Sequence, residues 1–370
     1  MKIIHTADIH LDSAMTSNFD KTEMRNRRAE ILVTFQKMVE YAVKNDVKAI
    51  IIAGDLFDTR RVAANSRNVV LSLIKNNPHI DFYYLKGNHD AESFLSELTV
   101  IPHNLKIFGN TWTSYVMNPV GKKNLILTGA ELTKDNSKQL INSLVLDRDK
   151  VNIVTLHGQI AGYTGKNDAE VINLPEYKNC GIDYMALGHI HMHEVETLDT
   201  RGIYVYPGCL EGRGFDECGE HGFELLEFDE VTGKLTHHFV PFARKRIYDL
   251  KVNVSGVNDS AEAATRVQNE LEKNNVDAAS LVRVRLSGEI EIETELDVDY
   301  LQKLFEEKYY IFRIQDETTH HVDYEEYRHD VSLKGEFVRT VGDSTELSPD
   351  DAAEIIKIGI DVLSGEEVAE

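Results

Sequence analysis

Five short polar motifs, each placed directly after a run that is typical of a buried strand, constrain the fold of this chain. They are Asp8-Ile9-His10, Gly54-Asp55, Gly87-Asn88-His89-Asp90, Leu156-His157-Gly158 and Gly188-His189-Ile190-His191. An open α/β sheet usually carries its site on the loops that follow the carboxyl ends of its strands. The five motifs therefore predict an α/β fold with polar side chains gathered at strand ends.

Together the motifs supply three Asp, one Asn and five His side chains. Borderline divalent metals such as Mn²⁺, Fe²⁺ and Zn²⁺ accept this mixture of ligands. Asp8 and His10 are two residues apart, so an extended strand end projects both to one side, and His189 and His191 repeat the spacing. Asp55 suits a ligand shared by two ions, as dinuclear hydrolysis requires. Five such motifs are hard to explain by packing alone.

The order of strand-like and helix-like runs predicts two stacked sheets flanked by helices. In the first part, strands are expected at 2–7, 47–53, 81–86 and 105–108, with helices at 23–44 and 64–75. Strands dominate the next part, at 124–131, 151–157, 184–188, 202–206, 223–229 and 235–241. The apolar periodicity of each run carries these assignments.

A second domain is expected after the basic stretch 243–246. Strands at 247–254, 280–286 and 310–314 alternate with helices at 261–273 and 298–306, which predicts a small βαβαβ unit. The expected domains are therefore 1–243, 244–318 and a C-terminal extension, 319–370. That extension ends in an amphipathic helix at about 350–363. The helix either packs on its own domain or docks on a partner.

Composition limits the kinds of partner. The formal net charge is −22, whereas a protein that binds nucleic acid through its surface field is usually basic. Bound divalent ions would reverse the local sign inside a cleft. There is no apolar run of about 18 residues, so no transmembrane helix and no membrane partner are expected. The first strand leads straight to Asp8, so a cleaved signal peptide would remove the site, and a cytoplasmic location is expected.

The sequence resembles the calcineurin-like metallophosphoesterases, and within them the SbcD-type DNA repair exonuclease subunits. The motifs that carry the resemblance are His5-Thr6-Ala7-Asp8-Ile9-His10-Leu11, Gly54-Asp55-Leu56-Phe57-Asp58 and Tyr206-Pro207-Gly208. The resemblance covers about residues 1–245. It implies a four-layer β-sandwich flanked by helices, with the small βαβαβ unit as a capping domain.

The resemblance also implies two ligand sets that share one carboxylate. These are Asp8, His10, Asp55 and His191 for one ion, and Asp55, Asn88, His157 and His189 for the other. We expect Mn²⁺, with Fe²⁺ or Zn²⁺ as alternatives. His89 would face the scissile phosphate and stabilise charge or protonate the leaving oxygen, with Asp90 fixing its ring.

Substrate and partners are expected on the same resemblance. It implies DNA as substrate, exonuclease and endonuclease action in double-strand break repair and recombination, and an SbcC-type ABC/SMC ATPase as partner. A homodimer would form through residues 64–76 and 92–101. Arg60 and Arg61 could meet a phosphate backbone, and Tyr163 could stack on a base or ribose. Ordinary solvated roles are the alternatives for these three residues.

Two other functions remain open on the sequence. A phosphatase or phosphodiesterase for small molecules could use the same metal core, and the acidic surface favours it because a small ligand needs no extended basic track. A non-catalytic scaffold is the third possibility, and the intact ligand set argues against it.

Overall fold

The computed structural model describes residues 1–15, 19–58, 62–90, 94, 100–118, 123–162, 170–292, 294–322, 324–327, 329–345 and 347–364. The chain divides into two compact units, Met1–Arg246 and Ile247–Glu370. Within the described ranges, no helix is both long enough and apolar enough to cross a membrane.

Six strands form the first sheet of the first unit. They are β1 (Lys2–Thr6), β2 (Val47–Ala53), β3 (Asp81–Leu85), β4 (Leu105–Ile107), β13 (Gly222–Phe228) and β14 (Leu235–Pro241). Their order across the sheet is β14-β13-β1-β2-β3-β4. The strands from β1 to β4 are parallel, whereas β13 and β14 continue the sheet in antiparallel register.

Six further strands form the second sheet. They are β5 (Thr113–Val116), β6 (Leu125–Gly129), β7 (Val151–His157), β10 (Tyr184–Gly188), β11 (Glu194–Thr197) and β12 (Ile203–Tyr206). Their order is β11-β12-β10-β7-β6-β5, with parallel strands in the centre and an antiparallel strand at each edge. A short parallel pair, β8 (Gln159–Ile160) and β9 (Val171–Ile172), follows β7.

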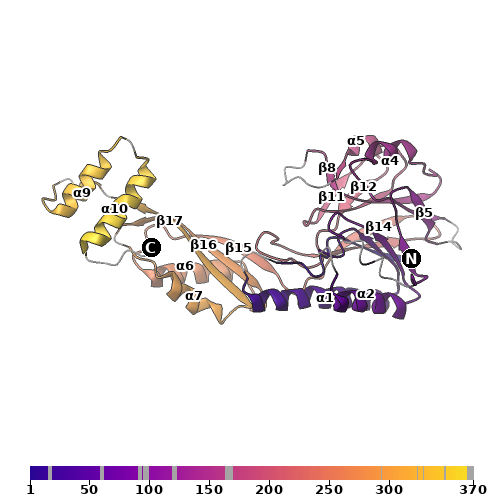
Figure 1. Cartoon of the computed structure of the whole chain (residues 1–370), viewed down its shortest axis with the longest axis horizontal. Coiled ribbons are helices and arrows are strands. Elements are labelled where there is room, and N and C mark those ends of the chain that lie inside the picture. Colours follow the sequence, from indigo (N-terminus) through magenta and orange to yellow (C-terminus); the bar gives the residue numbers. More distant parts are fainter. Residues whose placement is uncertain are drawn as a thin grey trace. The chain divides into compact units, whose positions relative to one another are not determined.

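Helices cover the outer faces of the two sheets (Figure 1). α1 (Lys21–Lys44) and α2 (Ala64–Asn76) lie on one side, and α4 (Ser137–Ser143) and α5 (Leu174–Tyr177) lie on the other. α1 begins two residues before the predicted start because Asp20 and Glu23 form a capping box that satisfies the first backbone N–H groups. The predicted fold class, two stacked sheets flanked by helices, is confirmed.

The apolar strands are buried on both faces, which explains their continuous hydrophobic runs. Along β2, Ile50 and Ile52 pack with the residues of α1 and α2, whereas Ala49 and Ile51 pack between the two sheets. A third apolar cluster lies between the second sheet and its helices. This layering leaves the carboxyl ends of β1, β2, β7 and β10 close together, and the motifs follow those ends.

The second unit begins with the predicted βαβαβ arrangement. It contains β15 (Ile247–Asn253), α6 (Ser260–Lys273), β16 (Leu281–Glu291), α7 (Val298–Glu306) and β17 (Ile311–His321). The three strands are parallel in the order β15-β16-β17. β16 and β17 extend beyond the expected ends because they continue to pair with each other as far as Glu291 and His321.

Three short helices follow: α8 (Tyr324–Tyr327), α9 (Leu333–Gly342) and α10 (Pro349–Ser364). Ala353, Ile356 and Ile360 on the inner face of α10 join an apolar cluster with Val338 of α9 and with Val322. The inner face of α10 therefore packs against its own unit, as one of the two expected alternatives requires. Its outer face still exposes apolar residues: Ile355, Ile358, Val362 and Leu363.

Candidate metal centre

The predicted ligands stand on backbone that turns sharply where the strands end. Four of them have positive φ angles: Asp8 at 51°, His10 at 50°, Asp55 at 51° and His189 at 108°. L-residues in this region cost roughly 1–3 kcal/mol, and such strain gathers at functional sites. The strained turns are held together, since the Asp8 N–H donates to the Gly54 carbonyl and the His10 N–H to the Asp55 carbonyl.

Glycines next to the ligands make room for them. A Cβ on Gly54 would lie 2.1 Å from His157 Nδ1, and one on Gly188 would lie 1.9 Å from the Ala53 carbonyl oxygen. Gly54 also has a φ of 96°, which glycine adopts without strain. These two glycines allow β2, β7 and β10 to approach one another closely at the site.

One group of possible ligands comprises Asp8, His10 and His191, whose ligand atoms lie within 4.8 Å of one another. His10 Nε2 is 3.1 Å from His191 Nε2. The other ring nitrogen of His191, Nδ1, lies 2.6 Å from Glu217 Oε1. A carboxylate at Nδ1 fixes the tautomer and leaves Nε2 available for a cation.

A second group comprises Asp55, His157 and His189, again within 4.8 Å. His157 Nε2 lies 2.9 Å from Asn88 Oδ1, while its Nδ1 lies 2.8 Å from the Ala53 carbonyl oxygen, which orients the ring. The Asp55 carboxylate lies between the two groups. Its Oδ2 is 3.3 Å from His157 Nε2 and 3.8 Å from His10 Nε2.

The electrostatics of the site favour positive charge. Burial alone would lower the pKa of His157, but the charges of Asp55 and Asp8 raise it to about 10. Burial lowers the pKa of His10 and of His189 to about 4, which favours the neutral form of these two rings at pH 7. Converging carboxylate, amide and imidazole donors with this charge preference fit two divalent cations.

His89 stands beside the two groups, and Asp58 rather than Asp90 holds its ring. His89 Nδ1 lies 2.8 Å from Asp58 Oδ1, and the hydrogen bond raises the pKa of His89. The side chain is 49% exposed, so it can reach a substrate. The backbone N–H of His89 donates to Asp55 Oδ1, which ties its loop to the shared carboxylate.

Asp90 braces the loop instead, so the role predicted for it is corrected. It is half-buried, and its two carboxylate oxygens accept the backbone N–H groups of Phe57 and Gly87 at 2.8 and 3.0 Å. Burial and the nearby Asp55 raise the pKa of Asp90 to about 7. Both oxygens of Asp90 accept backbone N–H groups, one from the segment that follows Asp55 and one from the loop that carries His89. Asp90 therefore connects these two segments, and Asp58 rather than Asp90 orients the His89 ring.

Sequence reasoning also missed Arg213 and Glu217. Both lie in the connection between β12 and β13, which has no periodic pattern that would mark a site. Asp58 did carry a signal, since it closes the motif that begins at Gly54. Its contact with the His89 ring depends on the folded structure, which brings the loop after β2 next to the loop that carries His89.

Other histidines near the motifs have structural partners. His193, which extends the last motif, has its Nε2 2.6 Å from the buried carboxylate of Glu224, and His237 Nδ1 lies 2.9 Å from the same carboxylate. His5 is fully buried and lies 2.9 Å from the Tyr184 hydroxyl. The three predicted substrate contacts, Arg60, Arg61 and Tyr163, lie outside the described residues.

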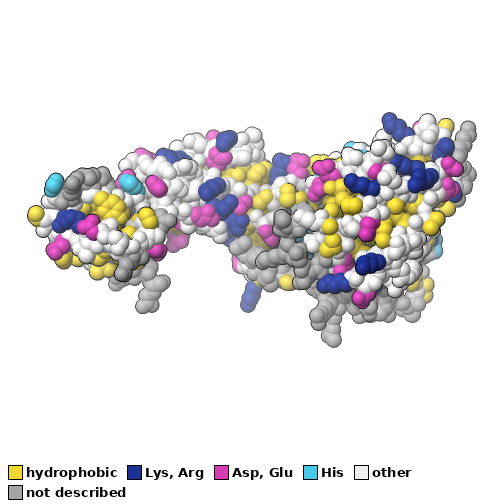
Figure 2. Space-filling view, turned by 90° about the horizontal axis from the view of Figure 1, so that it is seen from above, with side chains coloured by type: hydrophobic (Ala, Val, Ile, Leu, Met, Phe, Trp, Pro, Cys, Tyr) yellow, Lys and Arg dark blue, Asp and Glu magenta, His cyan; other side chains and the backbone are white. Residues whose placement is uncertain are grey.

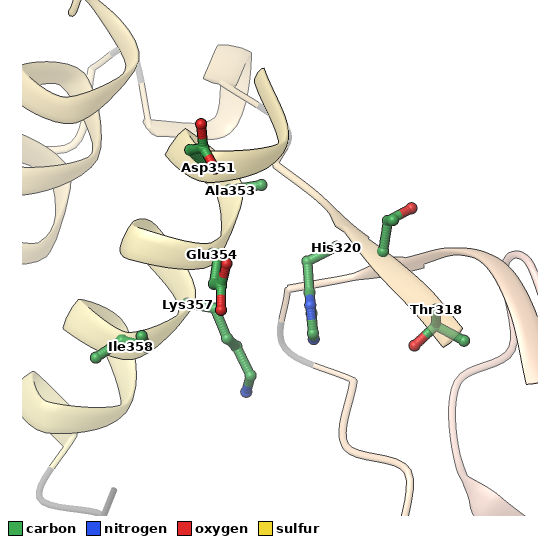
Figure 3. A pocket seen from close by; sticks show the side chains of 8 residues that line it. Thr318, His320, Asp351, Ala353, Glu354, Lys357 and Ile358 are labelled. Atoms are coloured by element: carbon green, nitrogen blue, oxygen red, sulfur yellow. The ribbon is translucent and has the colours of Figure 1, made fainter. Parts of the chain in front are cut away.

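A pocket of about 470 Å³ lies in the second unit and contains no member of the ligand set. In Figure 3, Glu354 and Lys357 extend from α10 toward His320 on β17. These side chains carry both signs of charge, and none of them belongs to the five motifs.

Comparison with known proteins agrees with this geometry. The family profile for calcineurin-like phosphoesterases matches residues 1–193. The DNA double-strand break repair protein Mre11 of Methanopyrus kandleri is 26% identical over 294 residues, which cover 72% of this chain and 62% of that protein. The uncharacterized metallophosphoesterase YhaO of Bacillus subtilis is 26% identical over 65% of this chain and 60% of its own length.

The chain thus spans about three-fifths of the length of these curated relatives. Among solved structures, a dimetal phosphatase from Danio rerio aligns with a TM-score of 0.41 at 9% identity, over 64% of this chain and 95% of that one. The family profile covers more than half of the sequence and includes all the predicted ligands. The chain belongs to the calcineurin-like phosphoesterase family and is a metal-dependent hydrolase.

Proposed function

We propose that this protein is a two-metal phosphodiesterase that cleaves DNA, as exonuclease and endonuclease, in double-strand break repair. The observation that carries the proposal is the Asp55 carboxylate, which lies within 4 Å of a histidine from each ligand group. The relatives named as Mre11 repair proteins support the choice of DNA. A DNA substrate also agrees with the expected cytoplasmic location.

The two ligand groups have distinct assignments in this proposal. Asp8, His10, Asp55 and His191 would hold one ion, and Asp55, Asn88, His157 and His189 would hold the other. We propose Mn²⁺ as the native metal. When bound, the two ions would activate water and neutralise the charge that develops on the phosphate.

His89 would act as the general acid in this proposal. Its ring is held by Asp58, is half exposed, and has a raised pKa, so it remains protonated to higher pH than an ordinary histidine. A protonated imidazole at the scissile phosphate can stabilise negative charge and protonate the leaving oxygen.

A direct assay tests the proposal. Purified protein is incubated with Mn²⁺ and end-labelled duplex or hairpin DNA, with and without the ATPase partner, and with metal omitted as control. Metal-dependent cleavage is expected. If DNA remains intact under all these conditions while small phosphodiesters turn over well, the choice of DNA is wrong.

The acidic surface favours a second candidate, a phosphatase or phosphodiesterase for small molecules. The net charge is −22, and on the face shown in Figure 2 the described Lys and Arg side chains are dispersed among Asp and Glu side chains. Bis-p-nitrophenyl phosphate, cyclic nucleotides and DNA compared under one set of conditions would separate the two candidates by their relative kcat/KM.

We also propose an SbcC-type ABC/SMC ATPase as partner. The exposed apolar residues Ile355, Ile358 and Val362 of α10 suit the docking of an amphipathic helix in a groove. Deleting the whole helix would uncover Val338 of α9, which is fully buried, so a surface substitution such as Ile358→Asp is the cleaner test.

A homodimer completes the proposal. On α2, Ser66, Val70 and Ile74 face the core, whereas Val69 and Leu73 line a shallow groove with Gln36 of α1. Most of the other segment expected at the dimer, residues 92–101, lies outside the described residues. Sedimentation of the purified protein would give the oligomeric state.

A further inference from the structure

The guanidinium of Arg213 lies between two carboxylates that both belong to the candidate metal centre. Its Nε and Nη2 donate to Glu217 Oε1 at 2.9 and 2.7 Å, and its Nη1 lies 3.4 Å from Asp58 Oδ2. The backbone N–H of Arg213 donates to Glu217 Oε2 at 2.7 Å, which ties the arginine and the glutamate into one unit.

Each of these carboxylates holds a histidine of the site. Glu217 Oε1 lies 2.6 Å from Nδ1 of His191, whose Nε2 faces the first ligand group. Asp58 Oδ1 lies 2.8 Å from Nδ1 of His89 and 3.5 Å from Nδ1 of His10. Arg213 is therefore connected to the candidate ligand His191 both through Glu217 and directly, since its Nη2 lies 3.0 Å from His191 Nδ1. It is connected to the candidate acid His89 through Asp58.

The surroundings make this arginine necessary. Asp58 is 14% exposed and Glu217 is 7% exposed, and two carboxylates removed from water beside one another repel unless a cation lies between them. Burial alone would raise the pKa of Glu217, but the hydrogen bond from His191 and the charge of Arg213 hold it well below its usual range. The planar guanidinium also fixes the direction of both contacts, which a lysine ammonium cannot do.

Arg213 is not placed as a phosphate-binding residue. Its Nε and Nη1 atoms face carboxylates of the protein, its Nη2 faces both Glu217 and the His191 ring, and its side chain is 22% exposed. An arginine whose donors are used in this way acts on the site through its neighbours.

We propose that Arg213 is a positioning residue that sets the rings of His191 and His89 together, by holding Glu217 and Asp58 in fixed relative positions. This inference rests on the proposed two-metal site. The orientation of the metal ligand His191 and that of the proton-donating His89 are therefore coupled, because both depend on the same guanidinium. Residues that orient metal-ligating histidines affect metal affinity or activity by about 10–100-fold.

Two kinds of measurement test the proposal in the full-length protein. Mn²⁺ binding to Arg213→Ala, Arg213→Lys and Arg213→Gln is followed by isothermal titration, and turnover of bis-p-nitrophenyl phosphate is followed at saturating Mn²⁺. We expect the affinity of one of the two Mn²⁺ sites to fall by about 10–100-fold, with the other changed less. We also expect kcat to remain below the wild-type value when both sites are saturated with Mn²⁺. Lysine can meet one carboxylate but not both, so Arg213→Lys should recover part of the loss.

Chemical rescue separates positioning from a general effect on the fold. A pocket of about 210 Å³ lined by Arg213, Asp58 and Glu217 gives small solutes access to the space that Arg213→Ala would leave. Guanidinium chloride, at concentrations well below those that unfold the protein, should restore Mn²⁺ affinity and turnover to this variant. Urea at the same concentration should restore neither, because it carries no charge.

Arg201→Met is the matched control. Arg201 also pairs with a half-buried carboxylate, because its guanidinium donates to both oxygens of Asp183. None of its hydrogen bonds among the described residues reaches the metal centre. The Arg201→Met variant should bind Mn²⁺ with unchanged affinity even if its melting temperature changes.

The outcomes are distinguishable. If the wild-type protein binds no Mn²⁺, the proposed metal site fails, and the inference fails with it. If the wild type binds two Mn²⁺ ions and Arg213→Gln binds them equally well with unchanged kcat, the inference alone is overturned. Losses that follow only the melting temperature, with no rescue by guanidinium or by lysine, would overturn it as well.

Discussion

Replacing Asp58 by asparagine tests the reassignment of the residue that orients His89. The substitution keeps the size of the side chain and removes its charge. Asp58 Oδ1 lies 2.8 Å from His89 Nδ1, and this hydrogen bond is the largest cause of the raised pKa of His89. Without it, the ring is less often protonated and less well oriented at neutral pH.

The expected size follows from what each side chain does. Removing a general acid costs roughly 10²–10⁴ in rate, whereas removing a group that only orients another residue costs about 10–100-fold. Asp58→Asn should therefore lower kcat for bis-p-nitrophenyl phosphate by about 10–100-fold at saturating Mn²⁺. The loss should be smaller than in His89→Ala. Metal content is measured on the same samples, because Asp58 also lies 3.5 Å from His10 Nδ1.

Asp90→Asn is the matched control, because it makes the same chemical change on the other aspartate near His89. The Asp90 carboxylate accepts two backbone N–H groups, and an amide has only one oxygen to offer them. One buried N–H then loses its acceptor, which costs about 1–3 kcal/mol in the free energy of unfolding. Asp90→Asn should thus lower stability more, and kcat less, than Asp58→Asn.

A double mutant gives the decisive comparison. If Asp58 acts through His89, then adding Asp58→Asn to His89→Ala causes little further loss in kcat. Independent, multiplied losses in the double mutant would refute the reasoning. So would an Asp90→Asn protein of normal stability whose kcat falls as far as that of Asp58→Asn.

Three further predictions concern the metal ligands, the C-terminal helix and the acid stability of the first unit. His89→Ala should keep both metals and lose about 10²–10⁴ in rate, whereas Asp55→Ala should lose metal as well; equal metal contents in the two purified variants would contradict this. Ile358→Asp should abolish co-purification with the ATPase at unchanged melting temperature, while Ile356→Asp, at a fully buried position, should unfold the second unit; continued binding by Ile358→Asp would remove the docking role. The pKa of the buried Glu224 is about 2 in the folded protein, below its ordinary 4.5, so its ionised form stabilises the fold above pH 4.5 and this contribution is lost as the pH falls toward 2. Glu224→Gln should therefore remove up to about 3 kcal/mol of pH dependence in that window, and an unchanged acid-unfolding curve would show that Glu224 contributes nothing there.

The sequence predicts the fold well where an apolar strand pattern ends at a polar motif. The run that precedes Asp8 and the run that precedes Asp55 are strands of one sheet, as their apolar patterns indicate, and both side chains follow a carboxyl end. The spacing of such motifs is local information, so it can be read from the chain directly.

Contacts between distant segments could not be predicted in the same way. Asp90 follows His89 directly in the chain, whereas Asp58 lies 31 residues before it. Only the three-dimensional course of the loops brings the more distant carboxylate, that of Asp58, to the ring. Glu217 meets His191 from a connection without helical or strand periodicity. The packing of α10 on α9 is likewise a tertiary contact, and its amphipathic pattern suited either of the two expected roles.

The left-handed backbone at Asp8, His10, Asp55 and His189 has a consequence for how such a chain evolves. Selection for folding alone would favour glycine at these positions, because it accepts positive φ without strain. The aspartates and histidines found there oppose that preference, so a chain released from the need to hydrolyse phosphoesters could gain stability by losing its own site. A glycine at any of these positions would then be a mark of lost activity in a protein that still folds.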